Sequence, residues 1–326
     1  MSSTPALAAG AAPALGDLPD GWRLEETTGP LGFVTHARLT SPGGGDFEWT
    51  SRRHRKGLGL RSSGRPVVEA GQVRRRPPPS RMSMALGSLF GIGSICFALG
   101  SLPWYFNAVP SRTVGITFFV GSIFFTSAAY LAYHEVLAAP EGIRRDSPRP
   151  SRIRAIVGWT PRRLDWWSTV VQFAGTLMFN VSTFAAISPS PDPTRVRNLI
   201  WAPDVGGSIC FLVASWLAYS EVNRGVLPRS DRSTGWRIAA LNMLGSIAFG
   251  VSAVAARYPG TNEEVANPSL VNLGTFSGAI CFLAGAALLP VESSLDNDAP
   301  PAGAVGPDGP SSDSMASPTP DRKVRP

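Results

Sequence analysis

The sequence predicts an all-α integral membrane protein, in which six transmembrane helices form three repeated hairpins behind a small N-terminal β-like cytoplasmic segment. Three observations predict this fold class. The chain contains six long apolar windows, every window contains the same five-residue pattern, and arginines gather in alternate connections between the windows. These observations describe the architecture far more closely than they describe an activity.

The six apolar windows each have about the length of the roughly 20 residues that a helix needs to cross a bilayer. They cover residues 84–104, 114–133, 166–187, 200–219, 238–256 and 271–289. None contains lysine or arginine, and Asp204 is their only carboxylate. Surface helices of soluble proteins carry a polar face, so windows without one predict transmembrane helices.

The five-residue pattern is Gly-small-aliphatic-x-Phe. It starts at Gly93, Gly121, Gly175, Gly207, Gly245 and Gly278, and it ends at Phe97, Phe125, Phe179, Phe211, Phe249 and Phe282. Residues four apart lie on one face of a helix, so the glycine provides a groove and the phenylalanine a knob for a neighbouring helix. The pattern therefore predicts helix packing, with the six rings in a common layer near the middle of the membrane.

The lengths of the connections predict how the windows pair. Short connections follow the first, third and fifth windows, and longer arginine-rich connections separate the resulting hairpins, 82–135, 165–222 and 236–292. Residues 121–135 align with 207–221 in the next hairpin, including a shared Leu-Ala-Tyr-x-Glu ending. We therefore expect one two-helix unit to occur three times.

The distribution of arginine predicts the orientation in the membrane. The net charge of +7 comes almost wholly from arginine, because Lys56 and Lys323 are the only lysines. Arginines gather at 52–81, 144–163 and 224–237, whereas the alternate connections hold few. Excess arginine marks the cytoplasmic side, so both termini are predicted to be cytoplasmic in a multi-pass protein of the cell membrane.

The rest of the chain divides by composition. Residues 1–20 are predicted to be disordered, 21–60 to form a small soluble segment with a β meander, and 61–81 to form a basic, proline-rich juxtamembrane linker. The membrane domain then covers 82–292, and a disordered tail follows Pro290 at 293–326. So short a β segment makes a poor core alone, so we expect it to need the membrane face or a partner.

The repeated Gly-Ser-Ile-x-Phe pattern in both helices of a hairpin, with the tryptophan-bearing entrance Gly235-Trp236-Arg237, resembles the YrhK-like membrane domain family. That family is a short helical hairpin unit without an assigned activity. The resemblance covers about 165–292 best, and 82–135 less closely because the entrance tryptophan is missing there. It implies a hairpin fold and carries over no catalytic or binding residue.

Three glutamates recur fourteen residues after a pattern glycine, at the predicted cytoplasmic ends of the even-numbered helices. They are Glu135, Glu221 and Glu292. A carboxylate at a helix C-terminus opposes the helix dipole, so a cation should compensate it. The sequence favours pairing with loop arginines such as Arg163, Arg224 or Arg237 at the lipid headgroups; an acidic ring at the mouth of a pore is the alternative.

Other polar residues have a structural and a functional interpretation. Asn180 and Asn242 lie within windows, where amides usually hydrogen-bond between helices, with a substrate contact as the alternative. Asp204 follows Pro203 and is predicted to be an N-cap at the outer interface, with a coupling-ion site as the alternative.

The basic stretch 51–60 precedes the first window. Such a stretch normally contacts anionic lipid headgroups, so the sequence disfavours nucleic acid as a partner, and His54 is expected at the surface. The three cysteines, Cys96, Cys210 and Cys281, have no metal-binding or redox spacing and are interpreted as small buried thiols.

No sequence motif of an enzyme is present: the chain lacks a phosphate-binding glycine loop, a His-Glu-x-x-His helix and a Gly-x-Ser-x-Gly elbow. The sequence therefore predicts no catalytic, cofactor-binding or metal residue, and a structural or interaction role without turnover. A small transporter or channel built from repeated hairpins is the alternative, and a sensor whose β segment reports to a partner is a third hypothesis. The oligomeric state is left open.

Overall fold

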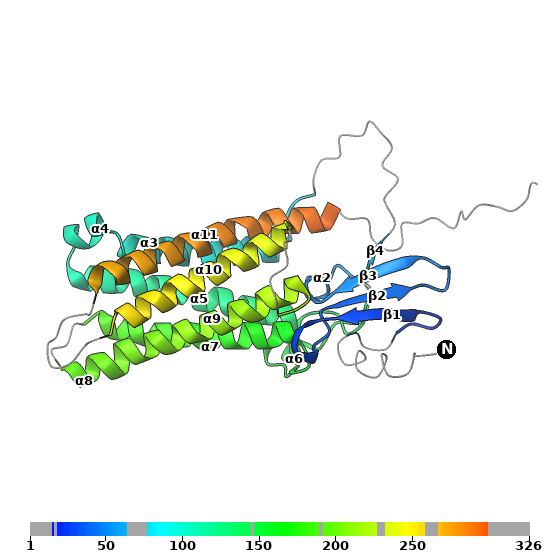
Figure 1. The fold of residues 1–326 in the computed structure, drawn as a ribbon, viewed down its shortest axis with the longest axis horizontal. Coiled ribbons are helices and arrows are strands. Elements are labelled where there is room, and N and C mark those ends of the chain that lie inside the picture. Colours follow the sequence, from blue (N-terminus) through cyan, green and yellow to red (C-terminus); the bar gives the residue numbers. More distant parts are fainter. Residues whose placement is uncertain are drawn as a thin grey trace, which may run out of the picture.

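The computed structural model describes residues 15, 18–63, 77–144, 147–188, 192–226, 232–257 and 267–298. A long helical bundle carries a small β-sheet at one end, which we call the sheet end, and the opposite end is the far end (Figure 1). Most of the segments predicted to be disordered, 1–20 and 293–326, and most of the predicted linker lie outside the described residues.

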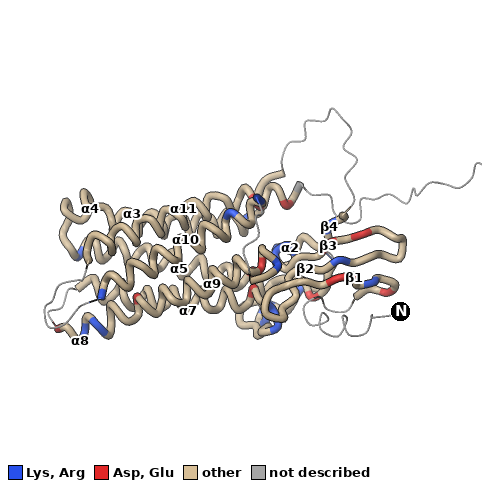
Figure 2. The backbone as a smooth tube through the Cα atoms, viewed as in Figure 1, with Lys and Arg blue, Asp and Glu red and all other residues tan. Residues whose placement is uncertain are grey.

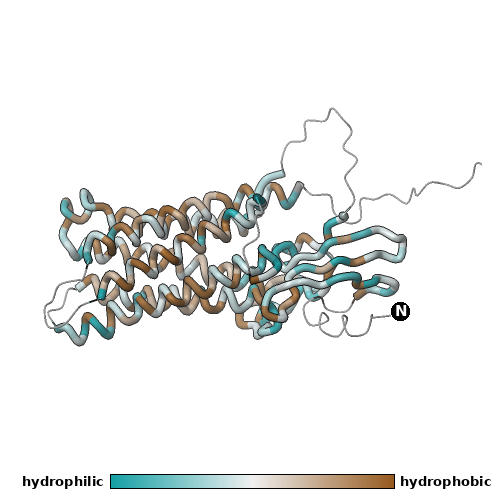
Figure 3. The backbone as a smooth tube through the Cα atoms, viewed as in Figure 1, coloured by the Kyte–Doolittle hydropathy of each residue, from teal (hydrophilic) through white to brown (hydrophobic). Residues whose placement is uncertain are grey.

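Six helical stretches are long and apolar enough to cross a membrane. They are α3 (Arg81–Gly100), α5 (Ser111–Leu137), α7 (Leu164–Ala186), the continuous stretch Pro193–Asn223, α10 (Thr234–Ala255) and α11 (Pro268–Asp298). Figure 3 shows hydrophobic residues along these helices, and hydrophilic ones in the sheet and the connections. The six predicted apolar helices are confirmed, and their length and composition are sufficient for the chain to cross a membrane several times.

Two shorter helices interrupt the connections. At the far end, α4 (Pro103–Ala108) lies between α3 and α5, and at the sheet end α6 (Arg152–Ile156) precedes α7. Each starts where the sequence favours a helix start: Pro103 occupies the first turn of α4, and the Ser151 hydroxyl accepts a hydrogen bond from the Arg154 backbone N–H.

The stretch Pro193–Asn223 corrects the prediction for Asp204. It consists of α8 (Pro193–Arg195), a π-helical turn (Val196–Trp201) and α9 (Ala202–Asn223), and Asp192 caps its start. Ala202 N–H donates to the Arg197 carbonyl five residues back, and this wide turn accommodates Pro203, which has no N–H to donate. Asp204 therefore lies inside a continuous helix and is not an N-cap.

The end of α11 corrects a second prediction. The helix passes through Pro290 and continues to Asp298, so 293–298 are helical rather than part of a disordered tail. The neighbouring helix α3 leaves room for the proline ring inside α11. Gly87 of α3 faces Pro290 and has no side chain, and a Cβ there would lie 3.3 Å from Pro290 Cδ.

The long helices form a closed ring in chain order, α3–α5–α7–α9–α10–α11, in which each helix packs mainly against the two beside it. Three neighbouring pairs share one close contact. A Cβ at Gly93 would lie 3.0 Å from the Gly121 carbonyl oxygen, and the corresponding distance is 3.1 Å from Gly207 to Gly175 and 3.1 Å from Gly245 to Gly278. Glycine at these positions lets the two backbones approach.

The six phenylalanines of the pattern fill the centre of the ring. All are buried in one cluster, which we call the phenylalanine layer: Phe97, Phe125, Phe179, Phe211, Phe249 and Phe282. Most neighbouring rings meet edge to face, for example Phe211 and Phe282, whose centroids are 5.8 Å apart. Such edge-on contacts are the favourable arrangement for aromatic pairs.

The small sheet is antiparallel, with strand order β1 (Arg23–Thr28), β2 (His36–Thr40), β3 (Asp46–Thr50) and β4 (Arg61–Ser62). The predicted β segment is confirmed. Its core consists of alternate residues of the strands, such as Leu39, Phe47 and Trp49, and Ile143 from the connection after α5 completes it. The connection after α5 thus supplies part of the core that so short a segment could not complete alone.

Candidate functional site

The candidate site lies where the sheet meets the bundle, and it is built from helix α2 (Ser51–Arg55), which follows β3 directly. The Thr50 hydroxyl accepts a hydrogen bond from the Arg53 backbone N–H, so the last residue of the strand is also the N-cap of the helix. Charged residues gather at this junction (Figure 2). The hairpins of the sheet thereby aim a basic helix at the ends of the membrane helices.

Glu292 on α11 has two cationic partners from this segment. Arg52 donates from Nε to Oε1 over 2.6 Å and from a terminal nitrogen to Oε2 over 2.9 Å. Lys56 Nζ lies 2.9 Å from Glu292 Oε2 and 2.7 Å from Asp296 Oδ2. Two parallel bonds between a guanidinium and a carboxylate are among the strongest and most directional hydrogen bonds in proteins.

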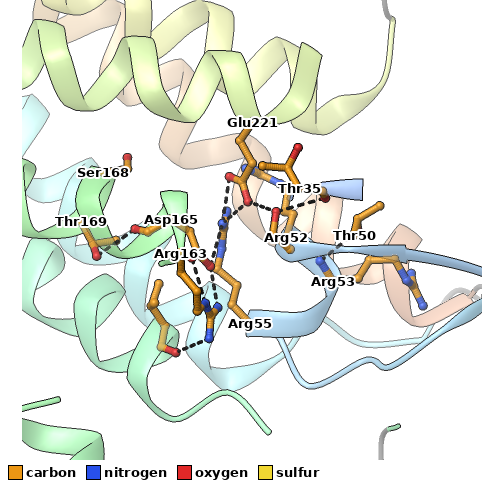
Figure 4. Close-up of polar contacts among 12 residues, drawn as sticks. Thr35, Thr50, Arg52, Arg53, Arg55, Arg163, Asp165, Ser168, Thr169 and Glu221 are labelled. Carbon is orange, nitrogen blue, oxygen red and sulfur yellow. Dashed lines mark hydrogen bonds and ion pairs between the residues drawn. The ribbon is translucent and has the colours of Figure 1, made fainter. Parts of the chain in front are cut away.

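Glu221 at the end of α9 also pairs with this segment, here through a single terminal nitrogen of Arg55. Arg55 donates to both of its carboxylate oxygens, over 2.9 and 3.0 Å, and the Ser51 hydroxyl donates to Oε1 over 2.5 Å. Figure 4 shows Arg55 pointing from α2 toward Glu221. We call Arg52, Arg55, Lys56, Glu221 and Glu292 the latch.

Asp165 at the start of α7 extends the network. Arg163 donates to its two oxygens over 3.0 and 2.6 Å, and Arg55 lies 3.8 Å from Oδ2. Burial opposes the charge of Arg55, but the carboxylates of Glu221 and Asp165 outweigh it, so the pKa of Arg55 is raised. The guanidinium therefore stays charged inside the junction.

Glu135 lies beside this network without an ion pair to another described residue. It lines a cavity of about 130 Å³ with Arg52, Arg55, Asp165 and Glu221. The structure thus brings Glu135 and Glu221 to one cavity. Glu292 does not line this cavity, but it binds Arg52, which does.

The partners of the glutamates differ from those predicted. Arg163 pairs with Asp165, Arg224 pairs with Glu48 of β3, and the latch cations come from α2 instead. The sequence could not reveal this because Arg55 and Glu221 are 166 residues apart. No local sequence signal shows that the sheet places this basic stretch against the ends of α9 and α11.

The environment of α2 also differs from the prediction for a lipid-facing stretch. Arg52, Arg53, Arg55 and Lys56 keep only 11 to 17 % of their side chains exposed, and each faces a carboxylate. The prediction for His54 is wrong: it is 5 % exposed and lies against Trp49, with ring centroids 5.5 Å apart. Burial and the nearby Arg163 lower the pKa of His54 to about 4, so it is neutral at pH 7.

The two membrane asparagines take different places. Asn180 donates to Thr126 Oγ1 over 2.9 Å and joins α7 to α5, as the sequence predicts for an amide between helices. Asn242 lines the cavity at the sheet end.

Cys96, Cys210 and Cys281 are free and partly buried. In the described part of the chain, no three His, Cys, Asp or Glu side chains lie close enough to hold a metal ion.

A second cavity, of about 240 Å³, lies toward the far end, on the other side of the phenylalanine layer. Phe97, Phe179 and Phe249 form its floor, whereas Phe282 borders the cavity at the sheet end. The layer therefore separates two cavities. Asp204 lines the second, which we call the Asp204 cavity.

Comparison with protein-family models, with curated proteins and with solved structures finds no match to this chain. The fold and the site themselves define a helical bundle fit to cross a membrane six times, with a small sheet held at one end by buried ion pairs.

Proposed function

We propose that this chain is a multi-pass membrane protein with a structural or interaction role and no turnover, which presents its N-terminal sheet at the membrane surface. The latch is the observation that supports this most directly. It ties the sheet to α11 through a bidentate ion pair and to α9 through the pair of Arg55 with Glu221, and both pairs are shielded from water. Breaking one buried ion pair costs several kcal/mol, so the sheet and the bundle act as one body.

The three helix pairs α3–α5, α7–α9 and α10–α11 are proposed to be repeats of one hairpin. In support, the two pattern glycines of each pair face one another, and each pair carries its glutamate toward the sheet end. The arginine excess of this end supports a cytoplasmic location for it, and so for both termini. A reporter that works only outside the cytoplasm, fused after residue 300, should stay inactive; an active fusion would reverse the orientation.

The proposed partners are the bilayer, anionic headgroups and a protein. The cations of α2 pair with carboxylates, so they are not assigned to lipid. The arginine-rich connections at 144–163 and 224–237 are proposed to contact the headgroups instead. Protein contact is assigned to the free face of the sheet, where Arg38 of β2 is 66 % exposed.

A photo-crosslinker placed at position 38 of the full chain tests this role in native membranes. We expect one discrete protein adduct from position 38, and only lipid adducts from position 273, because Leu273 is an exposed apolar residue on a membrane helix. Lipid adducts alone from both positions would contradict a role that depends on a protein partner.

A transporter or channel is the second candidate, and the pair of cavities on either side of the phenylalanine layer favours it. Hydrophobic constrictions gate pores by excluding water. Purified protein in vesicles decides between the two: ion and solute flux equal to that of empty vesicles supports the role without turnover. Flux that rises when Phe97 is replaced by alanine would establish the pathway instead.

A further inference from the structure

All six helices of the ring contribute residues to the lining of the Asp204 cavity, and the sheet contributes none. Its polar lining comes from hydroxyls and one amide, and Asp204 is its only charged lining residue. The polar side chains are Ser182, Thr183, Ser208, Ser252, Asn272 and Thr275. The cavity lies too far from the latch to share any lining residue with the cavity at the sheet end.

Asp204 is a carboxylate within a helix fit to cross the membrane, and no ion pair or hydrogen bond joins it to another residue that the structure describes. A carboxylate taken out of bulk water without a partner is strongly unfavourable. Ionisable residues at such positions mark pathways or ligand sites, where the missing charge comes from a ligand. Asp204 therefore points to a cationic ligand.

Two serines of the lining give an independent indication of a polar ligand. Ser182 is 5 % exposed and Ser208 is 3 % exposed, and neither hydroxyl has a hydrogen-bond partner among the described residues. Several serines in these helices instead donate to a carbonyl one turn back, as Ser94 does to Phe90 over 2.8 Å. Because both serines line the cavity, their hydroxyls are available to a bound molecule that accepts or donates hydrogen bonds.

Five of the other lining residues are aromatic, and they determine which cation fits. Phe97, Phe118, Phe179, Phe249 and Trp201 line the cavity. Aromatic rings attract organic ammonium groups, whereas a divalent metal ion requires several carboxylate or carbonyl oxygens, and only one carboxylate is present. The volume of about 240 Å³ accommodates a compact molecule rather than a bare ion.

We propose that the Asp204 cavity binds a small organic ammonium ion, with the carboxylate of Asp204 as counter-ion, the serine hydroxyls as hydrogen-bond partners and the aromatic side chains as walls. This site is independent of the latch and of the role proposed for the sheet. An interaction protein would use it to respond to the ligand, and a transporter would use it to hold its cargo.

Calorimetric titration of the purified full chain in detergent tests the site, with choline as the probe and 3,3-dimethylbutan-1-ol as its uncharged analogue. We expect choline to bind and the alcohol to bind at least about tenfold more weakly, because only choline carries the charge that Asp204 complements. The substitution Asp204→Asn should weaken choline binding by a similar factor. Asp192→Asn, which removes a carboxylate from the same helical stretch outside the cavity, should leave it unchanged.

A second variant covers the event that Asp204→Asn fails to fold, which its melting temperature would reveal. Ser208→Ala is expected to fold and to weaken choline binding by a few-fold, through loss of one hydrogen-bond partner. The proposal is wrong if choline binds equally to the folded Asp204→Asn and Ser208→Ala variants, if the alcohol binds as tightly as choline, or if only Na⁺ or K⁺ gives heat.

Discussion

Arg52 donates a hydrogen bond from Nε to Glu292 Oε1 over 2.6 Å, although 240 residues separate the two in the chain. Arg52 precedes the first membrane helix and Glu292 lies near the end of the last one. One ion pair therefore joins the sheet to the last helix of the ring. Three predictions concern the packing of the bundle and its sheet, and a fourth concerns pH.

Replacing Arg52 by glutamine should loosen the sheet from the bundle, because Glu292 would keep only Lys56 as its partner. Removal of one member of a buried ion pair costs about 3 kcal/mol or more. Hydrogen exchange of the α2 and α11 backbone amides should accelerate accordingly. Arg38→Gln is the matched control, since Arg38 is 66 % exposed and its pair with Glu26 spans 3.8 Å, so its effect should stay under about 1 kcal/mol. Equal effects of the two substitutions would contradict the latch.

Replacing Gly245 by leucine should destabilise the bundle by about 1 to 3 kcal/mol through overpacking. Even a Cβ at this position would lie 3.1 Å from the Gly278 carbonyl oxygen and close to the ring of Phe282. Gly250 lies on the same helix, and nothing lies within 4 Å of the Cβ it would gain, so Gly250→Leu is the control. Unfolding in a detergent mixture should separate the two variants, and a Gly245→Leu variant as stable as Gly250→Leu would refute the packing role.

Replacing Phe249 by alanine should lower the free energy of unfolding by about 3 kcal/mol, because it opens a cavity inside the phenylalanine layer. The ring of Phe249 contacts those of Phe97, Phe179 and Phe282. Phe184→Ala removes the same ring from a position that is 63 % exposed, where the side chain exchanges one apolar environment for another. Thermal unfolding should show the larger loss for Phe249→Ala; a larger loss for Phe184→Ala would place the core elsewhere.

Acidification should lower the stability of the junction between sheet and bundle, because His54 is buried there in its neutral form. Its pKa is 6.5 when unperturbed and about 4 in the folded protein, because burial and Arg163 disfavour the imidazolium, with Asp165 acting in the opposite direction. The unfolded state therefore binds more protons between these values, and stability falls as the pH falls from about 6.5 to 4. The loss at pH 5 is about 2 kcal/mol. His54→Gln should remove this dependence and His134→Gln should keep it, as measured by denaturation at pH 7 and pH 5.

A second group contributes only at lower pH. The hydrogen bond from His36 lowers the pKa of Glu48 to about 2, against the effect of burial, and Arg224 assists. This carboxylate stabilises the fold above about pH 4.5, and its contribution is lost as the pH falls through 2. A loss of stability that began only below pH 4.5 would therefore identify Glu48, rather than His54, as the sensitive group.

The sequence by itself determined the six long apolar helices and the small sheet. Both follow from local pattern: windows without charge have no polar face for water, and alternating residues around Phe47 and Trp49 bury one side of a strand. Helix ends were predicted less well, because Pro203 and Pro290 were interpreted as boundaries. A wide π-helical turn accommodates Pro203, and a close contact at Gly87 in a neighbouring helix accommodates Pro290.

Only the tertiary structure decided which charges meet. The sequence singled out Glu221 and Glu292 but named the wrong cations, since long-range pairing depends on where the sheet turns its basic helix. The same holds for Asp204, whose sequence neighbourhood resembles a helix start, whereas its environment is a cavity lined by residues of all six helices of the ring. Periodicity and composition are properties of neighbours along the chain, and they determine the elements. The latch and the Asp204 cavity depend on neighbours in space, which only the packed bundle defines.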